Sequence, residues 1–169
     1  MRCVGILVAA VAMLFGVVAG TPSAVAREVV AMPGGTPGQI IVRTQERHLY
    51  YVIGDGRAIR YPVGVGKAGM QWAGQAYVDG KYIKPAWIPP DIVRQENPRI
   101  ANYFPGGSPG NPMGVAALTL NGGEYAIHGT NRPSSIGRFV SHGCIRMYNR
   151  DVLDLFARVR VGTPVLVTE

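Results

Sequence analysis

Short segments rich in β-branched and aromatic residues follow one another along this chain, and turn-forming residues separate them. Residues 39–44, 48–53 and 58–65 have this composition, and Gly54-Asp55-Gly56 lies between the second and the third. Runs of this length bounded by glycine and aspartate are typical of strands that pair in hairpins. Four later segments have the same character: residues 76–83, 114–120, 124–128 and 163–168. The chain is therefore predicted to be mainly β, folding as a sandwich or a barrel-like sheet.

A single helix is predicted near the end of the sequence. Val152, Phe156 and Val159 recur at helical spacing and would share one face. Asn149 is a favourable N-cap residue, and Gly162 is suited to end the helix. We therefore expect one helix, packed by its apolar face on an otherwise β domain.

Residues 1–26 have the organisation of a signal peptide. Arg2 is followed by the apolar run of residues 4–18, and Ala24-Val25-Ala26 provides the small residues that precede a cleavage site. The apolar run is shorter than the roughly 20 residues that a membrane span needs. We expect export with cleavage after Ala26 and no stable membrane span afterwards, with a retained N-terminal anchor as the alternative.

The remaining sequence divides into a predicted tether and one domain. Residues 27–38 are rich in glycine and proline, as a flexible connection would be, and residues 39–169 have the size of a single domain. Within this domain, residues 85–112 are rich in proline and glycine and are predicted to be irregular. A loop of this length is often a lid or one wall of a substrate site.

The net charge of +7 favours an anionic partner, such as an acidic cell-wall polymer. Lysine and arginine are scattered along the sequence and form no run of four or more. Nucleic-acid binding would conflict with the predicted export, so we expect no nucleic-acid partner and a location in the periplasm or at the cell wall.

Cysteine usage is the most specific chemical feature of the chain. Cys3 lies in the predicted signal peptide, so export leaves Cys144 as the remaining cysteine. A single cysteine cannot form an internal disulfide; it is an inert buried residue, a bridge to another chain or a reactive thiol. A thiol is a strong nucleophile as the thiolate, which requires a nearby histidine or positive charge.

Two histidines are placed to activate Cys144. His128 lies sixteen positions earlier, at the end of a predicted strand, and His142 lies two positions earlier. On an extended strand His142 and Cys144 would project to the same face, but so short a tether makes proton transfer awkward. We favour His128 as the general base and keep His142 as the alternative, and either could instead be a structural hydrogen-bonding residue.

A glycine follows each histidine. Gly129 and Gly143 have no side chain, so we expect the backbone of a substrate to approach closely there. The backbone amides around His142, Gly143 and Cys144 are also candidates for an oxyanion hole.

Zinc binding is the main alternative use of these side chains. His128, His142 and Cys144 would provide three ligands and leave one position open. No Cys-x-x-Cys or His-x-x-x-His pair supports such a site. We therefore predict no metal, and nucleophilic chemistry at a thiol requires no cofactor.

Arg146 lies two positions after Cys144 and is predicted to share its face. A guanidinium group there would be suited to bind a substrate carboxylate through two hydrogen bonds. Arg132 and Arg138 lie between the two histidine segments and are expected to face solvent.

The segments around these residues resemble the catalytic signature of the L,D-transpeptidases. The resemblance is carried by His128-Gly129-Thr130 and by Ser141-His142-Gly143-Cys144-Ile145-Arg146-Met147. Further similar segments are Trp87-Ile88-Pro89-Pro90, Gly110-Asn111-Pro112-Met113-Gly114, Ser135-Ile136-Gly137 and Val161-Gly162-Thr163-Pro164-Val165. The resemblance covers about residues 39–167.

This resemblance implies a β-rich catalytic domain, an L,D-transpeptidase-like sandwich, that acts on peptidoglycan stem peptides. Cys144 would be the nucleophile, and His128 would be the base, oriented by the backbone carbonyl of Gly129. His142, Gly143 and the Cys144 amide would shape the oxyanion site. The residues expected to contact substrate are Arg146, Ser141 and Thr130.

The resemblance also implies a two-step acyl transfer. Cys144 would cleave the bond before the terminal D-Ala of a tetrapeptide stem, release D-Ala and hold the third residue as a thioester. An amine of a second stem, or of an outer-membrane protein, would then resolve the thioester. Two alternatives remain open: an L,D-carboxypeptidase, which resolves the same thioester with water, and a non-catalytic wall-binding module.

Overall fold

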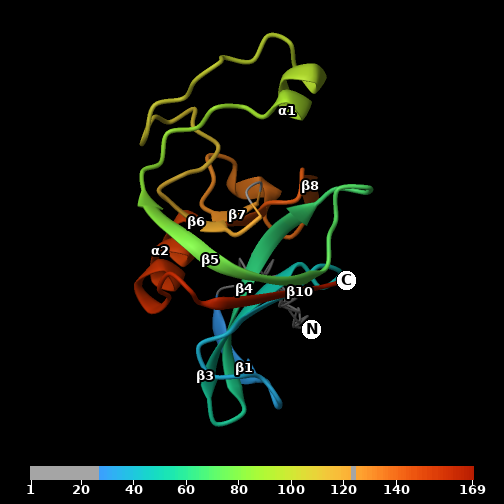
Figure 1. Cartoon of the computed structure of the whole chain (residues 1–169), viewed down its shortest axis with the longest axis vertical. Coiled ribbons are helices and arrows are strands. Elements are labelled where there is room, and N and C mark those ends of the chain that lie inside the picture. Colours follow the sequence, from blue (N-terminus) through green and yellow to red (C-terminus); the bar gives the residue numbers. More distant parts are fainter. Residues whose placement is uncertain (1–26, 123–124) are drawn as a thin grey trace, which may run out of the picture.

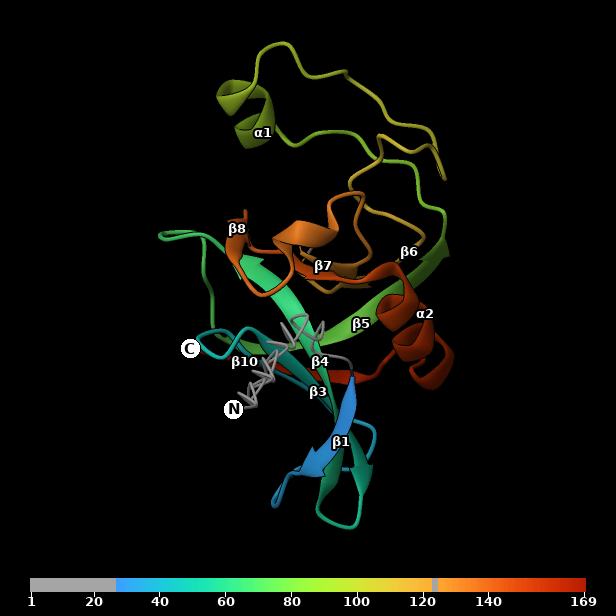
Figure 2. The ribbon, with the colours of Figure 1, turned by 180° about the vertical axis from the view of Figure 1, so that it is seen from behind.

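Strands dominate the structure, a computed structural model that describes residues 27–122 and 125–169. The predicted signal peptide and Glu124, the first residue of one predicted strand, lie outside the described residues. Figures 1 and 2 show the strands gathered around one core, with α2 on one side. The strands are β1 (Glu28–Ala31), β2 (Ile40–Arg43), β3 (His48–Gly54), β4 (Arg57–Gly66), β5 (Gly74–Ile83), β6 (Ala116–Leu120), β7 (Ala126–His128), β8 (Phe139–Ser141), β9 (Ile145–Met147) and β10 (Pro164–Thr168).

The strands form one sheet that closes on itself as a barrel-like sandwich. The strand order is β1-β4-β3-β2-β10-β5-β6-β7-β9, and an additional pairing of β4 with β9 joins strands that are distant in this order. β8 lies off this path and pairs with β4. β10 pairs in parallel with β2 and antiparallel with β5. The prediction of a mainly β sandwich is confirmed.

Burial of alternate apolar residues accounts for these strands. In β2, Ile40 and Val42 are buried, whereas Arg43 is exposed. β4 is buried along nearly its whole length because it pairs with β1, β3, β8 and β9. Tyr61 of β4 and Leu118 of β6 are fully buried in the same core. This core holds in place the strands β7 and β9, which flank the candidate catalytic residues.

The predicted helix is present as α2 (Asn149–Arg158), which buries Val152 and ends before Gly162. The N-cap prediction was wrong, because Tyr148 occupies that position and makes no side-chain capping hydrogen bond. Asn149 Oδ1 instead accepts a hydrogen bond of 2.9 Å from the backbone N–H of Thr130. The Asn149 side chain therefore holds the loop after β7 rather than the start of its own helix. In the described part of the chain, no helix combines the length and apolar character needed to cross a membrane.

Residues 85–112, which we call the arm, extend beyond the part of the sheet that contains β7 and β8 (Figure 1). The sequence predicts an irregular segment, but the arm contains the helix α1 (Asp91–Glu96), so the prediction of a single helix was wrong. A 3-10 turn, η1 (Pro133–Ser135), lies before β8. None of the α1 residues is buried, and this explains why no apolar periodicity marks α1 in the sequence. A β-bridge between Trp87 and Phe104 joins the two sides of the arm.

The start of the described chain corrects a second expectation. The sequence predicts residues 27–38 to be a tether, but Glu28–Ala31 form β1, antiparallel to β4. The carboxylate of Glu28 pairs with Arg60, and Met32 is buried in a small second cluster of apolar side chains. The high glycine and proline content of the whole segment concealed the two consecutive valines that favour this strand.

Candidate active site

The pairing of β7 with β9 brings the two histidine segments together. β7 ends at His128, and β9 begins at Ile145, directly after Cys144. The two strands are parallel, with Ile127 opposite Ile145 and His128 opposite Arg146. Residues separated by sixteen positions in the sequence therefore lie on neighbouring strands.

A cavity of about 130 Å³ lies between these strands and the arm. The sheet and the turn before β9 contribute the candidate catalytic residues and their neighbours: His128, Ser141, His142, Cys144 and Arg146. The arm and the residue after it contribute Trp87, Pro90, Val93, Pro112 and Met113. A thiol and an imidazole thus line the same partly enclosed space, with largely apolar side chains on the opposite wall.

His128 is buried and neutral. Its side chain is 4% exposed, and its Nδ1 lies 2.7 Å from the carbonyl oxygen of Gly129. Burial, followed by the positive charge of Arg146, lowers the pKa of His128 to about 4, although backbone hydrogen bonds at Gly129 and Pro112 oppose the shift. Because a carbonyl oxygen can only accept, Nδ1 carries the proton and Nε2 keeps its lone pair. This tautomer is suited to accept a proton at Nε2.

Cys144 is held mainly as a neutral thiol. Burial raises the pKa of the Cys144 thiol above its ordinary value, while a backbone hydrogen bond from Ala126 and the charge of Arg146 act in the opposite direction. Burial is the largest of these effects, so the thiolate has to be formed by proton transfer to a base.

Arg146 is a charged group that acts on both candidate catalytic residues, Cys144 and His128. Its Nε is buried and has no hydrogen-bond partner among the described residues, and burial lowers the pKa of its guanidinium. Its positive charge lowers the pKa of both Cys144 and His128, so it favours a thiolate and disfavours an imidazolium. Arg132 and Arg138 are exposed, which confirms that they face solvent.

The two glycines pack closely against other residues of the chain. A Cβ atom at Gly129 would overlap Oδ1 of Asn149, and one at Gly143 would overlap the ring of Tyr125. Gly143 also has a φ of +117°, a conformation that other residues rarely adopt. The space on the Cβ side of both glycines is therefore filled by Asn149 and Tyr125, so packing within the chain already requires a glycine at each position.

Ser141 and Thr130, two expected substrate-binding residues, make contacts within the chain. Ser141 Oγ donates a hydrogen bond of 2.6 Å to the carbonyl oxygen of Cys144 and accepts one of 3.2 Å from the N–H of Gly143. Ser141 also lines the cavity. Thr130 Oγ1 accepts a hydrogen bond of 3.0 Å from the backbone N–H of Arg132, and Thr130 lies outside the cavity lining. Both hydroxyls shape the turns next to the site.

His142 does not lie on an extended strand with Cys144, although both residues line the same cavity. It lies in the turn between β8 and β9, where its Nε2 is 2.9 Å from Oε2 of Glu96 and 3.2 Å from Nζ of Lys67. Sequence reasoning missed both partners, because single charges far apart in the sequence carry no local signal. Across residues 27–122 and 125–169, no group of three or more His, Cys, Asp or Glu side chains is arranged to hold a metal ion.

Comparison with known proteins identifies the family. A family model of the L,D-transpeptidase catalytic domain matches residues 37–167. The chain belongs to the L,D-transpeptidase family. It is 38% identical over 138 residues to the Escherichia coli strain K12 protein named Probable L,D-transpeptidase ErfK/SrfK. That alignment covers 77% of this chain but 44% of ErfK/SrfK, so the chain spans less than half the length of this relative.

Solved structures share the L,D-transpeptidase fold. L,D-transpeptidase 3 from Mycobacterium tuberculosis matches with a TM-score of 0.61 over 77% of this chain and 60% of that chain, at 16% identity. A Brucella melitensis structure, named as a probable carnitine operon oxidoreductase caia, is 39% identical and has a TM-score of 0.55, covering 84% of this chain and 92% of that chain.

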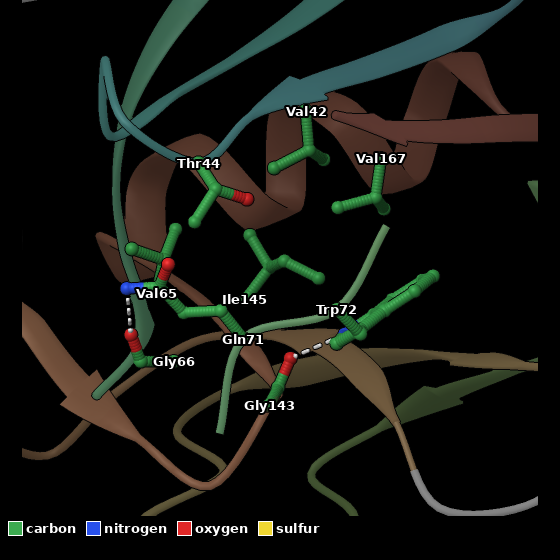
Figure 3. Close-up of a pocket in the computed structure, with 9 residues that line it drawn as sticks. All are labelled: Val42, Thr44, Val65, Gly66, Gln71, Trp72, Gly143, Ile145 and Val167. Atoms are coloured by element: carbon green, nitrogen blue, oxygen red, sulfur yellow. Dashed lines mark hydrogen bonds between the residues drawn. The ribbon is translucent and has the colours of Figure 1, made fainter. Parts of the chain in front are cut away.

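Two aromatic residues that sequence reasoning missed support the turn of this L,D-transpeptidase domain before Cys144. The indole Nε1 of Trp72 donates a hydrogen bond of 2.9 Å to the carbonyl oxygen of Gly143 (Figure 3). The rings of Trp72 and Tyr125 stack with centroids 5.0 Å apart and planes at 9°. The cavity behind the turn, drawn in Figure 3, is about 10 Å³ and is therefore too small for a substrate. Trp72 lies between two predicted strands, where no pattern marks it.

Proposed function

We propose that the chain is a peptidoglycan L,D-transpeptidase in which Cys144 is the nucleophile and His128 the general base. The thiol sulfur attacks the carbonyl carbon before the terminal D-Ala of a tetrapeptide stem. A C–S bond forms, the C–N bond breaks, and the proton taken by His128 passes to the departing amine of D-Ala. The amine of an acceptor then attacks the thioester, a new C–N bond forms as the C–S bond breaks, and the proton lost by the amine passes through His128 to the thiolate, which regenerates the thiol.

The observation that carries this proposal is the pairing, in one cavity, of Cys144 with a buried and neutral His128. With a pKa of about 4, His128 is an unprotonated base throughout the neutral range. The hydrogen bond from its Nδ1 to Gly129 fixes the tautomer, as an acidic third residue does in other triads. Burial of His128 strengthens each of these electrostatic effects, because the surrounding protein has a lower dielectric constant than water.

Arg146 and the turn before β9 have supporting roles in this proposal. The charge of Arg146 stabilises the thiolate as it forms, and Arg146 lines the cavity where its guanidinium group can meet a polar group of the substrate. The backbone amides of residues 142–144 remain the proposed oxyanion donors. The N–H of Gly143 makes a long hydrogen bond of 3.2 Å to Ser141, for which a developing oxyanion would compete. Ser141 and Thr130 act in this scheme by shaping the turns around the substrate.

The proposed setting is the periplasm or cell wall, reached by export through residues 1–26. The substrate would be a peptidoglycan stem peptide, and the acceptor a second stem or an outer-membrane protein. The net charge of +7 favours association with an anionic polymer.

Mass spectrometry of the processed protein with purified disaccharide-tetrapeptide tests the proposal. Loss of D-Ala with formation of a dimer linked through third-position residues is the expected result. The Cys144→Ala variant should form neither the thioester nor the dimer, and cross-linking by this variant would overturn the assignment. Loss of D-Ala with tripeptide as the sole product would instead identify an L,D-carboxypeptidase.

A further inference from the structure

The carboxylate of Glu96, at the end of α1, joins the arm to the candidate active site. Its Oε1 lies 2.6 Å from Nζ of Lys67, and its Oε2 lies 2.9 Å from Nε2 of His142. Each carboxylate oxygen thus has a separate nitrogen partner, which is the arrangement of a two-point carboxylate site.

The two nitrogen groups belong to residues outside the arm. Lys67 directly follows β4, and its backbone N–H donates a hydrogen bond of 2.9 Å to the carbonyl oxygen of Ser141. This bond extends the β4–β8 pairing and fixes Lys67 next to the turn that carries His142. The backbone positions of Lys67 and of the turn with His142 are therefore set by contacts outside the arm.

Glu96, in contrast, lies on an element that little else holds. α1 has six residues, none of them buried, and its N-terminus has no side-chain cap. Among the described residues, its other ion pair joins Asp91 to Arg94 within the helix itself. The contact of Glu96 with Lys67 and His142 is therefore the main polar attachment of α1 to the sheet.

The closed arm leaves little room for a substrate. The cavity of about 130 Å³ includes Pro90 and Val93 of the arm, as well as His142 and Cys144. Pockets that bury most of a drug-sized ligand have volumes of about 300–1,000 Å³. A tetrapeptide stem enclosed between the sheet and the arm would therefore need α1 to move away, and this movement would separate Glu96 from Lys67 and His142.

We propose that Lys67 and His142 bind the terminal carboxylate of the donor stem, and that Glu96 occupies this site until the donor displaces it. The inference rests on the proposed function, which supplies a donor ending in D-Ala. That carboxylate lies one residue beyond the carbonyl that Cys144 attacks, and His142 lies two positions before Cys144. The site selects donors with a free C-terminus, and binding of such a donor releases the arm.

Binding to the Cys144→Ala protein tests the inference without turnover. Calorimetry would compare a disaccharide-tetrapeptide with the same compound carrying a C-terminal amide. We expect the acid to bind about tenfold more tightly than the amide, as loss of one charge-assisted contact predicts. Adding Lys67→Met should reduce the preference for the acid to the part that His142 contributes, and adding Glu96→Gln should increase it. Asp91→Asn, an exposed charge change on the same helix, should leave the preference unchanged.

Equal affinities for acid and amide would overturn the inference, and so would a Lys67→Met variant that folds normally and weakens both ligands alike. Thermal unfolding of each variant separates lost binding from lost folding. Failure of the proposed function has a different signature: the Cys144 protein would release no D-Ala, while the preference for the acid and its dependence on Lys67 would persist.

Discussion

The indole Nε1 of Trp72 donates a hydrogen bond to the carbonyl oxygen of Gly143, the residue directly before Cys144. Tyr125 stacks on the same indole and fills the space that a side chain at position 143 would need. The position of the nucleophile therefore depends on two aromatic residues outside the family's signature segments.

Replacing Trp72 by Phe should preserve most of the stacking and remove the hydrogen bond to Gly143. We expect the free energy of unfolding to fall by about 1 kcal/mol, the usual value of one hydrogen bond. A displaced nucleophile should also lower kcat for D-Ala release by about tenfold, which corresponds to roughly 1.4 kcal/mol in the barrier. Thermal unfolding and release of D-Ala measure the two effects. Loss of stability with unchanged kcat would mean that this hydrogen bond stabilises the fold without positioning the nucleophile.

The pH dependence of acyl-enzyme formation should be flat across the neutral range. The reaction needs neutral His128, whose pKa is about 4, and the thiol of Cys144, whose pKa burial raises. The rate should therefore fall below about pH 4, as His128 becomes protonated, and change again only in the alkaline range. Mass spectrometry of the acyl-enzyme at fixed times gives the profile. An inflection between pH 6 and 7 would indicate that the acting histidine is not buried as described.

Replacing Arg146 by Gln should raise the pKa of both candidate catalytic groups, because its positive charge lowers both. At neutral pH the thiolate fraction should fall, and alkylation of Cys144 by iodoacetamide should slow by roughly tenfold. The acid limb of the activity profile should move to higher pH as the pKa of His128 rises. Since Arg146 Nε has no hydrogen-bond partner among the described residues, its removal should alter folding stability little. Unchanged alkylation would exclude an electrostatic role for Arg146.

Two aspartates of α2 should change stability in opposite directions. Asp151 is 1% exposed, its Oδ2 has no hydrogen-bond partner in the described chain, and burial raises its pKa. Its ionisation therefore opposes folding, and stability is lost as pH rises from the unfolded pKa of about 3.9 through the folded value. Asp151→Asn should stabilise the protein by about 1 kcal/mol at pH 7 and have little effect at pH 3.

Asp154 provides the matched control. Hydrogen bonds from Arg158 lower the pKa of Asp154, and Tyr61 donates to the same carboxylate at 2.6 Å. Its contribution is present above the unfolded pKa and is lost as pH falls through the folded value. Asp154→Asn should therefore destabilise the protein at pH 7 by about 1–2 kcal/mol, with the difference shrinking in acid. Denaturant unfolding at both pH values measures both variants, and equal signs would contradict the assignment.

Most of the sheet was predictable from the sequence, because alternation of apolar residues is a local property. Ile40 and Val42 are buried and Arg43 is exposed, as the strand period requires. β1 was missed because a predicted tether of high glycine and proline content concealed a short edge strand. α1 was missed because its attachment is a contact between Glu96 and groups that are distant in the sequence.

The candidate site was predictable in its residue types but less in its geometry. His128, Gly129 and Cys144 were identifiable from their motifs, and the hydrogen bond from His128 to Gly129 is present. Asn149 was predicted to cap its own helix because capping is a local preference. In the structure its side chain instead accepts a hydrogen bond from the backbone N–H of Thr130. Whether Asn149 accepts a hydrogen bond from the first turn of α2 or from Thr130 depends on tertiary packing, which no local pattern encodes.

The central position of β10 has a consequence for the synthesis of the chain. β10 (Pro164–Thr168) lies between β2 and β5, so it connects the strands made first to the strands made in the middle. The ribosome has to release nearly all of the described residues before these two parts can be joined. Contacts this distant in sequence form slowly, since a long loop must close first. The sheet should therefore be completed only late in synthesis, after β10 has left the ribosome, and the earlier strands should remain incompletely paired until then.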